Sequence, residues 1–260
     1  MSGYILCQTK KADTPYFIEN ISTNIYTIEE LCYYLYHNLY LVDDTIINEG
    51  LCTWIQEELG LPKLAAKLRP NLGKYASAED VLYPIFKEIN YLTYEELRIL
   101  NGQMKKLDAE PAAVREKQKG DALVENRMYV TAIHVYQKLL EREDLEIARE
   151  GITESVYHNL GCAYSYLFQM EKAVECFLKA YEQKQSKEAL KCYLLAYRSI
   201  RTPIEYESRL TELQTGEDVR QEIKEALDHF AKSPEKQVYS QHIDSLLEQL
   251  TREYHRSTGS

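Results

Sequence analysis

Apolar residues along most of this chain recur at steps of three and four, which is the spacing of one face of an α-helix. Short segments with helix start and stop signals separate these stripes. Thr27 and Thr93 each precede a glutamate at the third following position, which is the pattern of a capping box. Asp43 or Asp44 is expected to cap a helix that ends at Gly60. The pattern therefore predicts an all-α protein.

Strand-forming sequence is confined to the first 26 residues. Tyr4–Leu6 and Ile21–Tyr26 are short runs of β-favouring residues. They are too short to define a sheet domain, so we expect at most a short β hairpin or an extended arm before the first helix.

Residues 154–187 carry the most regular helical pattern of the chain. Its first half has an apolar stripe and a glycine that lets a partner helix approach closely. Its second half has a small–large–small stripe, as interdigitating helix packing requires. The first half contributes Tyr157, Leu160, Gly161 and Tyr164, and the second half contributes Ala173, Phe177 and Ala180. We expect a helical hairpin that must stack on similar hairpins to bury its apolar faces.

This stretch resembles a tetratricopeptide (TPR) repeat, with Tyr157 where the family usually has Trp and Gln185 where it usually has Pro. A weaker copy covers residues 113–146, and the offset from Ala132 to Ala173 is 41 residues. The family's period is about 34 residues. We therefore expect a longer connection between the two copies, around residues 141–151. The resemblance implies an array of helical hairpins that binds other proteins.

Asp108 to Pro111 interrupts the helical pattern and gives the predicted domain boundary. We expect an N-terminal helical domain over residues 1–110, which resembles no family that we recognise. Residues 111–260 are expected to form a TPR-like domain closed by C-terminal capping helices. The helices expected after the two repeat copies cover residues 187–200, 204–213, 216–231 and 235–254.

The formal net charge of −10 argues against a general role on nucleic acid or on anionic lipid. No run of apolar residues is long enough to cross a membrane, and the first residues lack the pattern of a signal peptide. The six cysteines contain no CxxC pair, as in proteins that keep their thiols reduced. We expect a cytoplasmic protein.

Motifs of catalysis do not appear in the sequence. It has no phosphate-binding glycine loop, no nucleophile elbow and no HExxH, and its histidines are isolated from other metal ligands. We therefore expect a non-catalytic protein without a cofactor or a metal. The alternative is an enzyme or a ligand-responsive regulator whose site lies in the N-terminal domain or in an interdomain groove near His37, Asp43 and Asp44.

A protein or peptide segment is the expected partner, bound in the concave groove that the first helix of each TPR hairpin lines. In one TPR class, lysine and asparagine side chains clamp the carboxylates of acidic C-terminal tails, and such a tail is one candidate ligand here. Lys117 and Asn159 match this clamp, Asp121 departs from it, and Lys187 and Lys191 are two residues out of register. The alternative for these lysines is an ordinary solvated position. With 22 tyrosines in the chain, a tyrosine-lined groove is also expected. The full set of candidate protein- or peptide-binding residues is Lys117, Tyr157, Asn159, Tyr166, Lys187 and Lys191.

Overall fold

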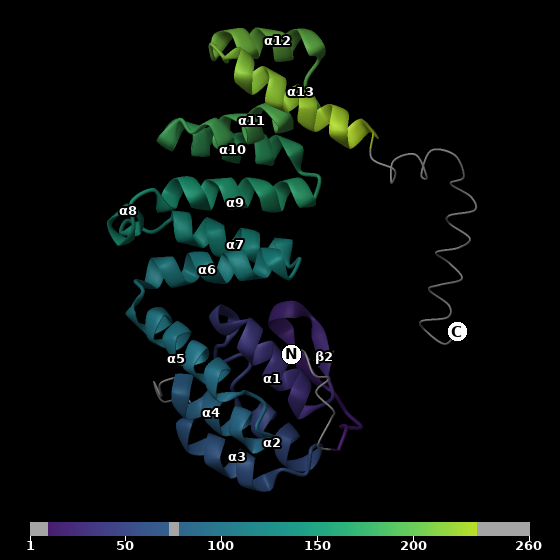
Figure 1. Ribbon diagram of the computed structural model, residues 1–260, viewed down its shortest axis with the longest axis vertical. Coiled ribbons are helices and arrows are strands. Elements are labelled where there is room, and N and C mark those ends of the chain that lie inside the picture. Colours follow the sequence, from purple (N-terminus) through teal and green to yellow (C-terminus); the bar gives the residue numbers. More distant parts are fainter. Residues whose placement is uncertain (1–9, 73–77, 233–260) are drawn as a thin grey trace, which may run out of the picture. The chain divides into compact units, whose positions relative to one another are not determined.

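The computed structural model describes residues 10–72 and 78–232, and within them the chain is all-α apart from one small β hairpin (Figure 1). By their internal contacts, residues 1–184 form one compact unit and residues 185–260 a second. The predicted boundary near residue 110 remains a prediction. In chain order the elements are β1 (Tyr16–Ile18), η1 (Glu19–Ile21), β2 (Thr23–Ile25), α1 (Ile28–His37), η2 (Leu39–Leu41), α2 (Glu49–Glu57), α3 (Pro62–Leu68), η3 (Arg69–Asn71), α4 (Ala78–Glu88), α5 (Tyr94–Ala109), α6 (Ala112–Glu125), α7 (Tyr129–Leu140), α8 (Leu145–Ala148), α9 (Ile152–Tyr166), α10 (Met170–Lys184), α11 (Lys187–Ile200), α12 (Pro203–Glu212) and α13 (Glu217–Lys232).

The β hairpin pairs β1 with β2 in antiparallel register, and Tyr16 lies opposite Ile25. Ile18 and Ile25 are buried and anchor the hairpin to the helices. Strand β2 lies within the predicted run of residues 21–26, whereas its partner β1 was not anticipated. The run at residues 4–6 lies outside the described residues.

Capping interactions set the starts of several helices. Both predicted capping boxes, at Thr27 and Thr93, are confirmed. The predicted cap at Asp43 or Asp44 is wrong, because Asn48 caps α2 by accepting a hydrogen bond from the Leu51 amide at 3.1 Å. The Asp43 carboxylate instead accepts from the backbone amide and the hydroxyl of Thr45, in a turn that delays the start of the helix.

Two helical hairpins, α6 with α7 and α9 with α10, follow one another and repeat the same central contact. Gly161 on α9 lies against the ring of Phe177 on α10, and a Cβ atom at this glycine would lie 2.7 Å from a ring carbon. Gly120 on α6 lies in the same way against the ring of Tyr136 on α7, and its Cβ would come closer still. The weaker repeat copy predicted from the sequence therefore packs like the stronger one.

The connection between the two hairpins contains the short helix α8, whose Leu145 is buried. This extra element explains why the period is 41 residues rather than about 34. The second hairpin ends at Gln185, whose φ of 52° is in the left-handed region. Proline cannot adopt this conformation, so glutamine at this position permits a turn that the family's usual residue does not allow.

Helix α6 also contacts the N-terminal helices, through η2 and the turn that follows it. The Lys119 ammonium lies 2.7 Å from the Asp43 carboxylate, and the Asn126 amide donates to the side-chain oxygen of Asn38 at 2.9 Å. The N-terminal helices therefore cover the side of the first hairpin that has no preceding repeat.

The second unit contains α11, α12 and α13, at the positions predicted for them within two residues. Leu194 and Leu210 are buried in it, and Val219 and Ile223 bring α13 into the same core. The predicted helix at residues 235–254 lies outside the described residues.

The glycine–aromatic contact predicts the effect of adding one methyl group. We expect Gly161→Ala to lower the free energy of unfolding, because crowding against Phe177 costs about 1–3 kcal/mol and outweighs a gain in helix propensity of about 1 kcal/mol. Gly102→Ala, in α5, meets no atom within 4 Å and should stabilise the protein or leave it unchanged. Urea unfolding of both variants measures the difference. A Gly161→Ala protein as stable as Gly102→Ala would show that the contact is not tight.

Candidate functional site

Asp121 on α6 is the acceptor of a cluster of polar side chains that joins the two hairpins. One carboxylate oxygen accepts from the Lys117 ammonium at 2.5 Å. The other accepts from the Tyr136 hydroxyl and from the Asn159 amide, both at 2.7 Å. The donors come from α6, α7 and α9, and the side chains of Lys117 and Asp121 are only 14% and 20% exposed. We call Lys117, Asp121, Tyr136 and Asn159 the Asp121 cluster.

The Tyr136 hydroxyl remains a proton donor throughout the useful pH range. Its ring is fully buried, and burial raises its pKa above the ordinary value of a phenol. The hydrogen bond to Asp121 raises the pKa further, because a phenolate could not donate to a carboxylate. The bond between Tyr136 and Asp121 therefore links the two helices of the first hairpin.

The structure brings two predicted site residues, Lys117 and Asn159, onto the same carboxylate. The sequence predicted that they would hold a partner's carboxylate and that Asp121 would repel it. In the structure Asp121 itself takes both donors, so an incoming carboxylate would have to compete with a charge that is already in place. The contact of Lys117 and Asn159 with a ligand remains a prediction.

Tyr166, a third predicted residue, lies on the same face of α9 as Asn159, because seven residues are close to two helical turns. Its side chain is 60% exposed, and its ring stacks on Tyr129 of α7 with centroids 4.6 Å apart and planes within 8°. Phe168, in the turn between α9 and α10, is 88% exposed. The sequence did not single out Tyr129 or Phe168, since only the tertiary structure brings the two hairpin turns together.

Tyr157 lies on the opposite side of α9, because a step of two residues turns a helix by about 200°. The Lys179 ammonium of α10 lies over its ring at 5.3 Å from the centroid. The tyrosine lines a hollow between α7 and α10 rather than the face that carries Asn159 and Tyr166. The predicted set of six residues is therefore divided between two faces of the first unit and the separate second unit.

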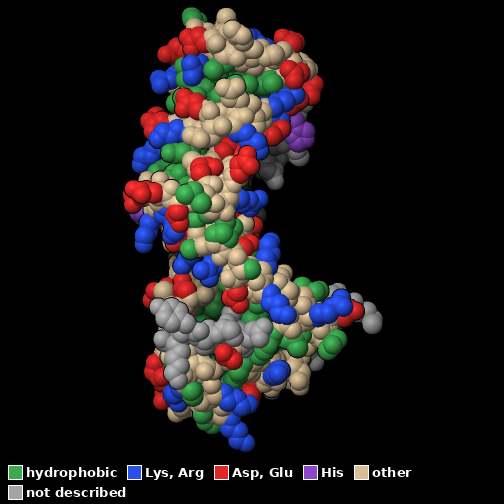
Figure 2. Space-filling model, turned by 90° about the vertical axis from the view of Figure 1, so that its left-hand side faces the viewer, with side chains coloured by type: hydrophobic (Ala, Val, Ile, Leu, Met, Phe, Trp, Pro, Cys, Tyr) green, Lys and Arg blue, Asp and Glu red, His purple; other side chains and the backbone are tan. Residues whose placement is uncertain are grey.

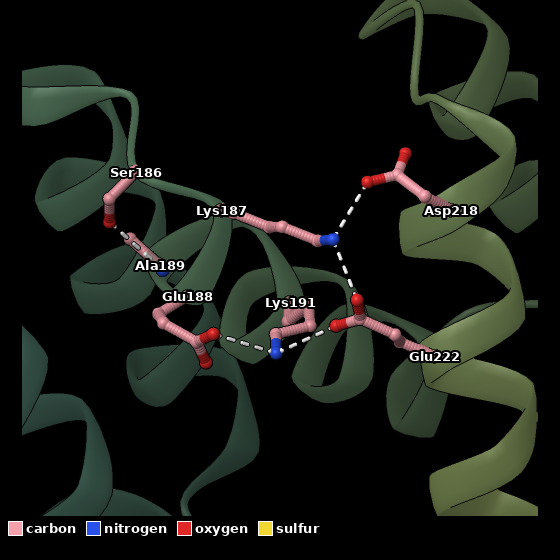
Figure 3. A network of polar contacts seen from close by, with 7 residues as sticks. All are labelled: Ser186, Lys187, Glu188, Ala189, Lys191, Asp218 and Glu222. Carbon is pink, nitrogen blue, oxygen red and sulfur yellow. Dashed lines mark hydrogen bonds and ion pairs between the residues drawn. The ribbon is translucent and has the colours of Figure 1, made fainter.

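Lys187 and Lys191, the remaining predicted residues, belong to the second unit, where acidic side chains surround them (Figure 3). The Lys187 ammonium lies 2.7 Å from Asp218 and 2.6 Å from Glu222 on α13. The Lys191 ammonium lies 2.8 Å from Glu188 and 3.0 Å from Glu222. These two cations join α11 to α13, and their contact with a partner remains a prediction.

The ion pairs shift the pKa values of their members in opposite directions. The hydrogen bond to Asp218, followed by the one to Glu222, raises the pKa of Lys187. The hydrogen bonds from Lys187 and Lys191 lower the pKa of Glu222. The contribution of Glu222 to stability is present above its unfolded pKa of about 4.3 and is lost as the pH falls through its folded value. The contribution of Lys187 is present below about pH 10.4 and is lost as the pH rises through its raised value.

The N-terminal residues proposed for the alternative function do not converge on one pocket. The ring of His37 lies against that of Tyr33 in a tilted contact, with centroids 4.4 Å apart, and lines one hollow of about 230 Å³. Asp43 lines a second, of about 260 Å³, in which its charge is paired with Lys119. Burial raises the pKa of Asp43, but the hydrogen bonds from Lys119 and Thr45 outweigh this effect and hold the pKa below its usual range. Asp44 lines neither hollow.

Among residues 10–72 and 78–232, no group of three or more His, Cys, Asp and Glu side chains could hold a metal ion. No helix in this part of the chain is long and apolar enough to cross a membrane. Acidic and basic side chains are interspersed over the face shown in Figure 2. This face therefore offers both positive and negative side chains to a partner.

Removal of the Asp121 carboxylate should destabilise the protein. We expect Asp121→Ala to lower the free energy of unfolding by about 2–3 kcal/mol, because it leaves the buried Tyr136 hydroxyl and the Lys117 ammonium without an acceptor. Asp108→Ala removes the same side chain from an exposed position of α5 and should change stability by less than about 0.5 kcal/mol. Urea unfolding compares them, and equal effects would show that the cluster does not stabilise the hairpins.

The lowered pKa of Glu222 depends on its two lysines. In the Lys187→Gln/Lys191→Gln double variant we expect the pKa of Glu222 to rise towards the ordinary value of a glutamate, because both ion pairs are lost. Carboxyl-carbon NMR during an acid titration measures it. Lys184→Gln, on α10 of the first unit, is the control and should leave it unchanged. An unchanged pKa in the double variant would mean that the ion pairs do not form in solution.

Comparison with known proteins gives one family. Residues 154–187 match the family model described as tetratricopeptide repeat, and they cover α9 from its third residue, all of α10 and the first residue of α11. No curated protein and no solved structure matches the chain. Repeats of this family typically act as non-catalytic modules of protein interaction. The chain therefore contains a tetratricopeptide repeat at residues 154–187, stacked on a second helical hairpin that packs in the same way.

Proposed function

We propose that this protein is a non-catalytic adaptor that holds a protein or peptide segment on the face shared by α6 and α9. We call this surface the α6–α9 face and define it by Lys117, Asp121, Asn159, Tyr166 and the adjoining Tyr129. The family match at residues 154–187 supports a role in protein interaction. The location of the binding face, and the role as adaptor, are our proposal.

The observation that carries the proposal is the stacked pair of Tyr129 and Tyr166. A tyrosine that is 60% exposed and held rigid by a second ring offers apolar area at a low cost in conformational entropy. Rigid aromatic side chains of this kind are enriched among the residues that dominate protein interfaces. The pair lies about two helical turns along α9 from the Asp121 cluster, so a bound segment could contact aromatic and polar groups together.

The charges of the face set the chemistry of the ligand. Lys117 is paired with Asp121, so this part of the face offers no unpaired cation to a carboxylate. A segment that brings apolar or aromatic side chains to Tyr166 fits this surface better than an acidic C-terminal tail does. The tail remains a candidate that the experiment below can identify.

A photoreactive phenylalanine analogue at position 166 tests the proposal in native extract. We expect a cross-linked partner at position 166 and none at position 94, because Tyr94 is even more exposed (85%) but lies on α5, away from the proposed face. With the partner purified, Tyr166→Ala should weaken binding about tenfold or more, and Tyr94→Ala should not. Cross-linking of the same partner at both positions, or equal affinities of the two alanine variants, would place the binding site elsewhere.

A further inference from the structure

A second surface of the first unit lies on the side of α9 opposite to the α6–α9 face. Helices α7 and α10 form its walls and α9 its floor, and they enclose a groove of about 570 Å³. Leu160 and Tyr164 of α9 are buried beneath it, and Tyr157 is partly exposed in it. We call it the α7–α10 groove. Its floor consists of Tyr157, Leu160 and Tyr164, whose rings and methyl groups can contact the apolar side chains of a partner.

Two lysines of α10 lie along the rim of this groove, each held over a tyrosine of the floor. The ammonium of Lys172 lies 5.2 Å from the ring centroid of Tyr164, and that of Lys179 lies 5.3 Å from the ring centroid of Tyr157. The two lysines are seven residues apart on α10, and the two tyrosines are seven apart on the antiparallel α9. The same contact therefore occurs twice, about 10.5 Å apart along α10. The rings favour these positions of the two charges before any ligand binds.

These two cations differ from the lysines that the sequence singled out. Lys117, Lys187 and Lys191 are all paired with carboxylates of the chain itself. Neither Lys172 nor Lys179 has a carboxylate within 4.0 Å among the residues that the structure describes, so their charges are available to a partner.

Glu175 lies between the two lysines on the same rim, so that the α10 wall presents a positive, a negative and a positive charge. The three positions follow the i, i+3, i+7 spacing, which also places side chains on one face of a ligand helix. A helix that carries an acidic, a basic and an acidic residue at this spacing would oppose each charge with its complement. An extended strand would not, because its side chains repeat at about 6.6–6.8 Å and the groove has no strand edge to pair with it.

We infer that the α7–α10 groove binds an amphipathic helix of a partner protein, with acidic, basic and acidic side chains against Lys172, Glu175 and Lys179. The apolar side of that helix contacts Leu140 of α7 and Leu160 of α9, which line the groove. This surface is separate from the α6–α9 face, so the inference stands whether or not that face binds a ligand.

Two designed helical peptides test the charge pattern on the full chain. They share the same apolar face, and one carries Glu, Lys and Glu where the other carries Lys, Glu and Lys. One further charged position, on the side of the peptide that faces solvent, is Lys in the first and Glu in the second, so that the two compositions are equal. We expect the Glu–Lys–Glu peptide to bind about tenfold more tightly in fluorescence anisotropy, and this preference to shrink as salt is added. Methyl NMR should show shifts at Leu140 and Leu160.

Charge-reversal variants decide whether the groove causes the preference. We expect the preference for the Glu–Lys–Glu peptide to invert in the triple variant Lys172→Glu/Glu175→Lys/Lys179→Glu. In the double variant Lys172→Gln/Lys179→Gln the preference should be lost without inversion. Lys63→Glu, on the exposed side of α3, changes the net charge as much as the triple variant does and should leave the preference intact. Tyr166→Ala should also leave it intact, which separates this test from that of the α6–α9 face.

Three results would overturn the inference. They are equal binding of the two peptides, binding that leaves the methyl signals of Leu140 and Leu160 unshifted, and no binding of either peptide at millimolar concentration.

Discussion

The close approach of a glycine to an aromatic ring is the constraint on which the two hairpins depend. Gly120 and Gly161 let the rings of Tyr136 and Phe177 lie against the backbone of the facing helix. That approach sets the spacing of each hairpin and, in the first hairpin, carries the Tyr136 hydroxyl to Asp121. Tyr136 can therefore join the polar link between α6, α7 and α9 because Gly120 leaves room for its ring.

Two groups of lysines on the surface have different partners. Those at predicted ligand-binding positions are neutralised within the chain, Lys117 by Asp121 and Lys187 by two carboxylates of α13. Those on the outer rim of α10, Lys172 and Lys179, lie instead over tyrosine rings. A cation over a ring keeps its charge available, whereas an ion pair largely cancels it at a distance. Our inference for the α7–α10 groove therefore places binding by charge on a face that the family resemblance did not indicate.

The helical pattern was predictable because it depends on local rules. Capping boxes at Thr27 and Thr93 and the hairpin at residues 154–187 follow from residues only three or four positions apart. The cap of α2 was predicted wrongly because two aspartates and one asparagine offered equally suitable side chains. Asp43 does not cap α2 because its carboxylate is paired with Thr45 and Lys119. Since Lys119 is distant in the sequence, local rules could not predict this pairing.

The sequence alone determined that the chain is helical and that it contains one tetratricopeptide repeat, and it predicted a weaker copy before that repeat. These properties are carried by periodic positions within single hairpins. Only the tertiary structure decided which side chains meet between helices: Asp121 with Asn159, Tyr129 with Tyr166, and α11 with the carboxylates of α13. Such contacts join residues some 30 to 40 positions apart, and their geometry depends on how the helices pack. For that reason the sequence could name the candidate residues but could not show that Asn159 binds Asp121 or that Tyr166 stacks on Tyr129.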